Sequence, residues 1–114
     1  MGPNLTLIID QPNKEKAFQI IHFDGNFDKA GHSEIRDQLD EIVLNFSPRT
    51  LIFDLKNLKF INSEGIGYLM EIHTHLVQRD KKLVLVAPNA HVADVFKTIG
   101  IAEIIPVHEN MSQV

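Results

Sequence analysis

Short apolar segments alternate with segments of helical periodicity along this chain. Residues 5–9 and 17–23 are rich in branched and aromatic side chains, and turn-forming residues follow each of them. This pattern is typical of two strands joined as a hairpin. Apolar side chains at helical spacing then predict an amphipathic helix over residues 30–46, which Pro48 prevents from continuing.

The second half of the chain continues the alternation. Residues 50–55 and 83–86 contain continuous apolar runs, which suits strands buried on both faces. Helical periodicity occupies residues 64–79, and Asn89 is a suitable N-cap for a third helix. A last short strand within residues 101–107 contains a proline, so we expect it at a sheet edge.

Length and composition bound the fold and the function class. A chain of 114 residues, 44% of them hydrophobic, can form one core. We therefore predict a single α/β domain over residues 1–114, with helices packed against a mixed sheet of four or five strands. The formal net charge of −4 gives no general attraction for nucleic acid.

The same composition argues against several kinds of site. No apolar run approaches the roughly 20 residues of a membrane span, so we expect no membrane insertion and a cytoplasmic location. Cysteine is absent and the six histidines are scattered, so we expect no metal and no other cofactor. Nothing in the composition suggests a catalyst.

Ser63 is the candidate functional residue. It follows a predicted turn at residues 57–61 and comes immediately before the helix predicted at residues 64–79. Free backbone N–H groups and the positive end of the macrodipole favour negative charge at a helix N-terminus. A hydroxyl there is either a helix cap, worth about 1 kcal/mol, or the acceptor of a regulatory phosphate. The residue type alone allows both.

Three motifs occur in order along the chain. Gly25-Asn26-Phe27-Asp28 follows the second predicted strand, and residues 60–67 read Phe-Ile-Asn-Ser-Glu-Gly-Ile-Gly. Residues 82–105 contain Leu-Val-Leu-Val-Ala-Pro and later Ile-Gly-Ile. In this order and spacing they resemble the STAS domain of bacterial anti-sigma factor antagonists. That family has a Gly-Glu-Leu-Asp signature and a phosphorylation loop, commonly Phe-Met-Asp-Ser-Ser/Thr-Gly-Leu-Gly, and the resemblance implies the STAS fold.

The resemblance implies a function without catalysis. An unphosphorylated antagonist of this family binds an anti-sigma factor that is also a serine kinase of the histidine-kinase-like ATPase type, which frees the sigma factor. The kinase phosphorylates the antagonist, the complex is lost, and a serine phosphatase reverses the modification. The acceptor corresponds to Ser63. Asn62 stands where the family usually has Asp, and Glu64 where a small residue is usual, so the local negative charge is displaced by two positions.

Further residues are candidates for a partner-binding surface around Ser63. Asp28 suits either that surface or a helix start, and Gly65 allows either close packing or the approach of a partner. Tyr68 and Ile72 form either an exposed docking stripe or ordinary exposed side chains. The candidate surface comprises Asp28, Asn62, Glu64, Gly65, Tyr68 and Ile72. The predicted core face of the same helix comprises Ile66, Leu69, Met70, His73, Leu76 and Val77.

Two other function classes stay open. A STAS interaction module that is not phosphorylated, such as a transporter-associated subunit or a signalling scaffold component, would keep the fold without the switch. A flavodoxin-like enzyme or nucleotide-binding domain would need a glycine-rich phosphate loop, convergent carboxylates or a nucleophile–base pair, and the sequence contains none of these patterns.

Overall fold

Five strands form one mixed sheet in the computed structural model, which describes residues 2–114. The strands lie in the order β1-β2-β3-β4-β5; β1 pairs antiparallel with β2, and all other neighbours are parallel. The predicted hairpin and the mixed sheet are therefore confirmed, as is the edge position of the last strand. The strands are β1 Leu5–Ile9, β2 Phe18–Phe27, β3 Thr50–Ile61, β4 Lys82–Val86 and β5 Val107–His108.

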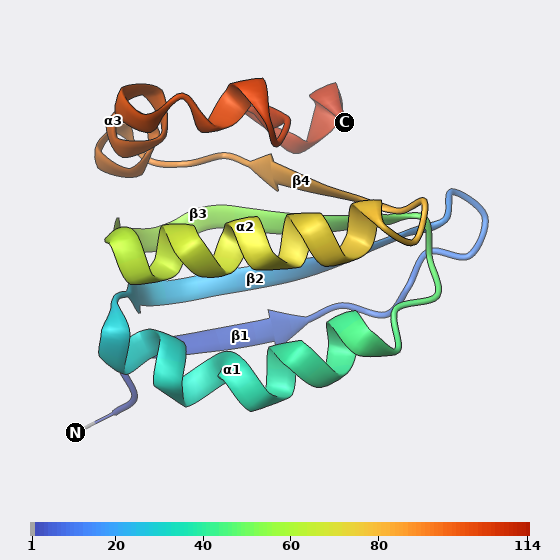
Figure 1. Cartoon of the computed structure of the whole chain (residues 1–114), viewed down its shortest axis with the longest axis horizontal. Helices are drawn as coiled ribbons and strands as arrows, with labels where there is room; N and C mark the ends of the chain where they lie inside the picture. Colours follow the sequence, from blue (N-terminus) through green and yellow to red (C-terminus); the bar gives the residue numbers. More distant parts are fainter. Residues whose placement is uncertain (1) are drawn as a thin grey trace.

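Helices connect the parallel strands (Figure 1). Parallel neighbours require a crossover connection, and here a helix follows each of β2, β3 and β4. None of the helices in residues 2–114 combines the length and the apolar character that crossing a membrane requires. The helices are α1 Lys29–Leu44, α2 Ser63–Val77 and α3 Ala90–Ile99, with the short 3-10 turns η1 Ile101–Glu103 and η2 Met111–Gln113.

β3 is longer than the sequence predicts. The predicted turn at residues 57–61 is wrong, because this segment continues the strand and pairs with β2 as far as its last residue. Register shifts between the two strands bring Leu55, Leu58 and Ile61 into the core at a spacing of three residues. A bulge of this kind breaks the two-residue alternation by which a strand is recognised in a sequence.

The segment after α3 also differs from the prediction. The short strand predicted within residues 101–107 begins only at Val107, and the segment before it contains η1. Ile101 and Ile105 are both buried, and their four-residue spacing suits a helical turn better than an alternating strand. The local signals at α3 are confirmed: Asn89 caps its start, and Gly100 ends it in the left-handed conformation with φ of 71°.

The main core lies between the sheet and the helices. Alternate side chains of the central strands enter it, among them Phe23 and Phe53, whose ring centroids are 4.7 Å apart. The opposite face of the sheet has a smaller apolar cluster around Ile52, Val84 and Val86. The helices therefore cover one face, and the second face carries only a limited apolar patch.

Candidate functional site

Two adjacent strand–helix junctions form the end of the sheet that carries Ser63. β2 ends at Phe27 and β3 ends at Ile61, and these two residues are paired. The residue after each strand caps the next helix: Asp28 caps α1 and Asn62 caps α2. The backbone N–H of Asn62 also donates to the carbonyl of Phe27 at 3.2 Å. The positive ends of two helices therefore lie at the same end of the molecule (Figure 1).

Asn62, rather than Ser63, is the cap of α2. Its Oδ1 accepts hydrogen bonds from the backbone N–H groups of Glu64 at 3.0 Å and Gly65 at 3.4 Å. Ser63 is the first residue of the helix and is exposed, and its hydroxyl makes no side-chain hydrogen bond to any residue from 2 to 114. The interpretation of Ser63 as the helix cap is therefore wrong, and its hydroxyl is accessible for modification.

Asp28 and Gly65 have structural roles at this end of the molecule. Asp28 Oδ1 accepts from the N–H of Gly31 at 2.9 Å and from Nδ2 of Asn4 at 2.6 Å. It therefore fixes the start of α1, as its interpretation as a helix-start residue predicts. A Cβ added at Gly65 would lie 2.6 Å from the carbonyl oxygen of Phe27. Close packing of α2 on β2 thus accounts for this glycine.

The face of α2 that packs on the core differs from the predicted one. Tyr68 and Ile72 are each only 3% exposed, so the expectation of an exposed docking stripe is wrong. The Tyr68 hydroxyl donates to the carbonyl of Arg36 at 3.3 Å and is also bonded to the carboxylate of Asp40, both on α1. Val77, predicted in the core, is 49% exposed.

Contact with α1 explains this change of face. α2 packs against α1 as well as against the sheet, so its buried stripe turns toward the neighbouring helix. Burial, with the hydrogen bond and charge of Asp40 and the charge of Glu71, raises the pKa of Tyr68 well above its ordinary value. The hydroxyl therefore remains a donor between the two helices. The buried residues of α2 are Gly65, Tyr68, Leu69, Ile72 and Leu76.

A surface hollow of about 330 Å³ lies beside Ser63. His32 is the residue of this site that the sequence analysis missed. Its Nδ1 is 3.9 Å from Oε2 of Glu64, and its ring centroid is 4.4 Å from that of Tyr68. Its position one helical turn after Asp28 was the available signal, since it places the imidazole near the start of α1. The hollow is lined by His32, Ser63, Glu64, Gly67, Tyr68 and Glu71.

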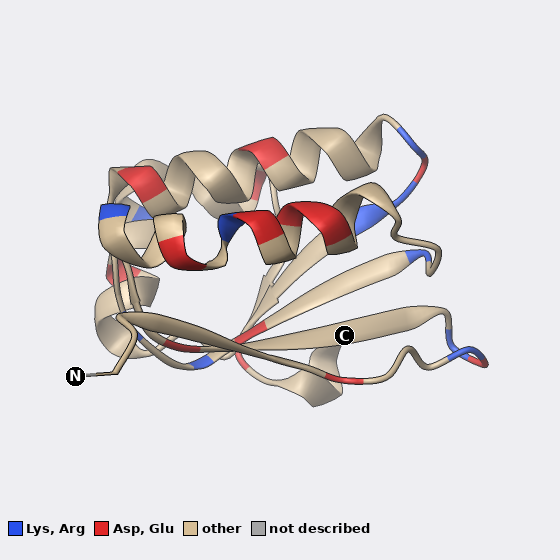
Figure 2. Cartoon of the chain, turned by 90° about the horizontal axis from the view of Figure 1, so that it is seen from below, with Lys and Arg blue, Asp and Glu red and all other residues tan. Residues whose placement is uncertain are grey.

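Acidic residues recur along both α1 and α2 (Figure 2). Lysine and arginine are frequent in the loops at the far end of the sheet in the same view, and others lie on α1, including Lys29 at its start. Glu64 and Glu71 both line the hollow beside Ser63. The surroundings of Ser63 therefore combine helix N-termini, which favour negative charge, with carboxylates that oppose more of it.

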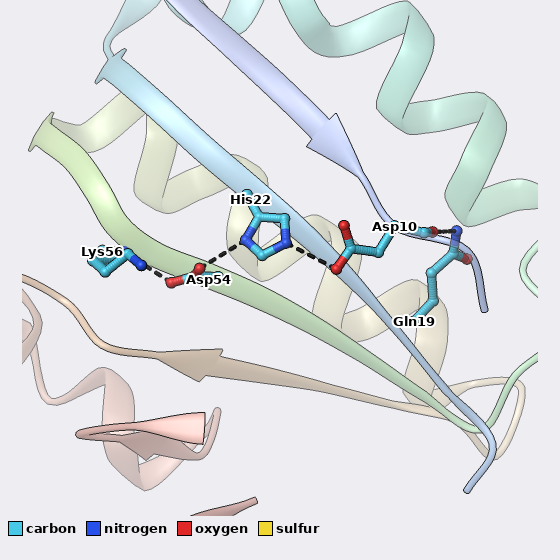
Figure 3. Close-up of polar contacts among 5 residues, drawn as sticks. All are labelled: Asp10, Gln19, His22, Asp54 and Lys56. Atoms are coloured by element: carbon cyan, nitrogen blue, oxygen red, sulfur yellow. Dashed lines mark hydrogen bonds and ion pairs between the residues drawn. The ribbon is translucent and has the colours of Figure 1, made fainter. Parts of the chain in front are cut away.

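A second polar cluster lies on the face of the sheet away from α1 and α2 (Figure 3). His22 Nδ1 is 2.7 Å from Oδ2 of Asp54, and its Nε2 is 2.9 Å from Oδ2 of Asp10. Burial lowers the pKa of His22, but the hydrogen bonds and charges of both carboxylates outweigh burial and raise it. The imidazole and the two carboxylates are hydrogen-bonded to one another, and they connect the end of β1 to β3 across β2. This arrangement indicates a structural role.

The chain is similar to known proteins over most of its length. The family model described as "STAS domain" matches residues 11–114. Among curated relatives, the anti-sigma F factor antagonist of Paenibacillus polymyxa is 24% identical over 91 residues, which cover 80% of this chain and 78% of that protein.

Solved structures share the fold at low sequence identity. An anti-sigma factor antagonist from Mycobacterium paratuberculosis has a TM-score of 0.83 at 16% identity and covers 96% of this chain and 89% of its own. The Bacillus cell fate determinant SpoIIAA in its phosphorylated form has a TM-score of 0.67 at 18% identity and 90% coverage of both chains. A sulfate transporter family protein from Wolinella succinogenes has a TM-score of 0.73 at 16% identity, with 91% and 84% coverage. With the family match over residues 11–114, this chain belongs to the STAS domain family.

Proposed function

We propose that this chain is an anti-sigma factor antagonist, a binding module without enzymatic activity that is switched by phosphorylation of Ser63. Unmodified, it binds an anti-sigma factor that is also a serine kinase, which frees the sigma factor for transcription in the cytoplasm. Phosphorylation ends that complex, and a serine phosphatase restores it. The names of the Paenibacillus and Mycobacterium proteins support the antagonist role, and the phosphorylated form of SpoIIAA supports the switch.

The exposed hydroxyl of Ser63 is the observation that carries this proposal. Asn62 supplies the helix cap, so Ser63 is not needed to start α2, and its hydroxyl points to no partner within residues 2–114. A phosphate adds a charge of about −1.5 to −2. The adjacent helix N-terminus accommodates that charge, so the fold survives modification.

The same phosphate changes what a partner meets. A partner docked over Ser63 must exclude water from a dianion that lies beside the half-exposed Glu64 carboxylate. Removing such a charge from water without a matching cation costs several kcal/mol, and about 1.4 kcal/mol is already a tenfold loss of affinity. The switch therefore acts by local charge and bulk.

The partner surface is proposed to centre on Ser63 and Glu64. Asn62, Asp28 and Gly65 form the junction beneath it and set the positions of both helix starts. Tyr68 and Ile72 are buried against α1, so they support the surface from below and are not direct contacts. Substitutions of Ser63 and Glu64 should change binding. Substitutions of Tyr68 and Ile72 should change stability.

Phosphorylation by the cognate kinase tests the proposal. Incubation with that kinase and ATP should add one phosphate, detected as an increase of about 80 Da in intact mass, a value set by the chemistry of phosphorylation. Ser63→Ala should abolish the increase, and Ser33→Ala, which removes an exposed serine of α1, should leave it unchanged. Phosphate on any other residue would contradict the assignment, as would protein from native cells that is never modified under any growth condition.

A STAS interaction module without phosphorylation is the second candidate function. The fold likeness to the Wolinella sulfate transporter family protein supports it. In that case the partner would be a transporter or a scaffold, and binding would not depend on the Ser63 hydroxyl. Equal binding of a purified partner by the wild type and by a variant with phosphoserine at position 63 would favour this candidate.

A further inference from the structure

His32 has a special place in the hollow beside Ser63. It is the only lining residue that can carry a positive charge, since the other ionisable side chains there are Glu64, Glu71 and the buried phenol of Tyr68. A phosphate on Ser63 would enter a hollow with two carboxylates and one imidazole. The state of that imidazole therefore decides the local charge balance.

The packing of His32 directs one ring nitrogen toward the hollow. Its ring lies against Tyr68 and, at 6.4 Å between centroids, against Phe27. Nε2 is buried and has no hydrogen-bond partner among residues 2–114, whereas Nδ1 faces the Glu64 carboxylate at 3.9 Å. A proton on Nδ1 is thus placed where it can interact with anions at the start of α2.

We propose that His32 is the internal counter-cation of phosphorylated Ser63, and that its imidazolium form pairs with the phosphate and Glu64 in this hollow. The inference rests on the proposed function only in taking Ser63 as the modified residue. It makes the second ionisation of the phosphate depend on the imidazole beside it, because a neighbouring cation favours the dianion.

The other charged groups around His32 do not replace it. On α2, Glu64 and Glu71 are anionic and Tyr68 keeps its proton. On α1, Asp28, Lys29 and Arg36 lie about one helical turn from His32. Asp28 is engaged with Gly31 and Asn4, and neither Lys29 nor Arg36 lines the hollow. A pH-dependent positive charge in the hollow therefore has one source.

Phosphorus NMR on protein with phosphoserine encoded at position 63 tests this inference. The phosphorus resonance is followed from pH 5 to pH 8 in the wild-type background, in His32→Gln and in His108→Gln, a control on β5. Loss of the imidazolium should raise the midpoint of the phosphate titration by about 0.5 pH units, less than for a close ion pair because the site is exposed. His108→Gln should leave the midpoint unchanged.

His32→Lys supplies the converse variant, since a permanent cation should keep the midpoint low. Equal midpoints in the wild-type background and in a folded His32→Gln would overturn the inference. If that variant does not fold, the phosphorylated wild type decides alone: its His32 ring proton resonances must move on modification while those of His108 stay in place. Because the phosphoserine is encoded and no kinase is used, these outcomes are independent of whether a kinase modifies Ser63.

Discussion

Removal of the His22 imidazole should destabilise the fold in a pH-dependent way. The side chains of His22, Asp54 and Asp10 are 30%, 13% and 44% exposed, so the bond to Asp54 is the better shielded of the two. A hydrogen bond to a charged group contributes roughly 1.5–3 kcal/mol when shielded, and an exposed ion pair about 0–1 kcal/mol. We therefore expect His22→Gln to lose about 2 kcal/mol of unfolding free energy at pH 6, mostly through Asp54.

The sign of the pH dependence follows from the raised pKa of His22. Burial opposes the charged form, but the two carboxylates outweigh it, so the folded protein binds this proton more tightly than the unfolded chain does. The stabilisation is complete below the ordinary value of 6.5 and is lost as the pH rises through the raised pKa. The difference between wild type and His22→Gln should therefore shrink from pH 6 toward pH 9.

Urea unfolding at pH 6, 7, 8 and 9 measures this difference. His91→Gln removes an exposed histidine of α3 and is the matched control, expected to show a small difference that does not vary with pH. At each pH the free energy of unfolding of the variant is subtracted from that of the wild type, and this cancels the titration of groups far from the substituted site. A loss in His22→Gln that is equal at all four pH values would refute the reasoning, because the imidazole would then act by packing and not by charge.

Substitutions at four further positions test the structure of α2 and its start. Gly65→Ala should lower the free energy of unfolding by about 1–3 kcal/mol, because its Cβ meets the Phe27 carbonyl. Gly67→Ala has open space around the Cβ and should raise the free energy of unfolding by up to ~1 kcal/mol. Equal effects of the two variants in thermal melts would contradict this packing. Asn62→Ala removes the helix cap and should lower the free energy of unfolding by about 1 kcal/mol. Asn62→Asp keeps the cap and should raise that free energy by about 0.5 kcal/mol through the helix dipole. A less stable Asp variant in urea unfolding would argue against the cap. Ile72→Asp should abolish cooperative unfolding in circular dichroism, since it buries a charge, and a fully folded variant would mean that this face of α2 is exposed.

Signals that depend on near neighbours in the chain were sufficient for much of the fold. Asn89 caps α3 and Gly100 ends it, as their residue types predict, because a cap bonds to backbone only a few positions away. The positions of the first two strands and of the helix that follows them could be predicted from periodicity in the same way. The motif around Ser63 also identified the family that the match over residues 11–114 establishes.

Contacts between distant residues decided the remaining features. The bulges of β3 lie where it pairs with β2, and they interrupt the alternation that marks a strand. His32 and Glu64 come together only because α1 and α2 start side by side.

The sequence by itself determined most of the helices and strands, the start and end of α3, and the family. Only the tertiary structure decided which side of α2 is buried. Tyr68 bonds to Arg36, 32 positions earlier in the chain, and that contact turns the helix toward α1. α2 has apolar residues on more than one side, so its sequence does not show which side is buried. Helical periodicity indicates that a buried face exists, and packing against α1 determines which face that is.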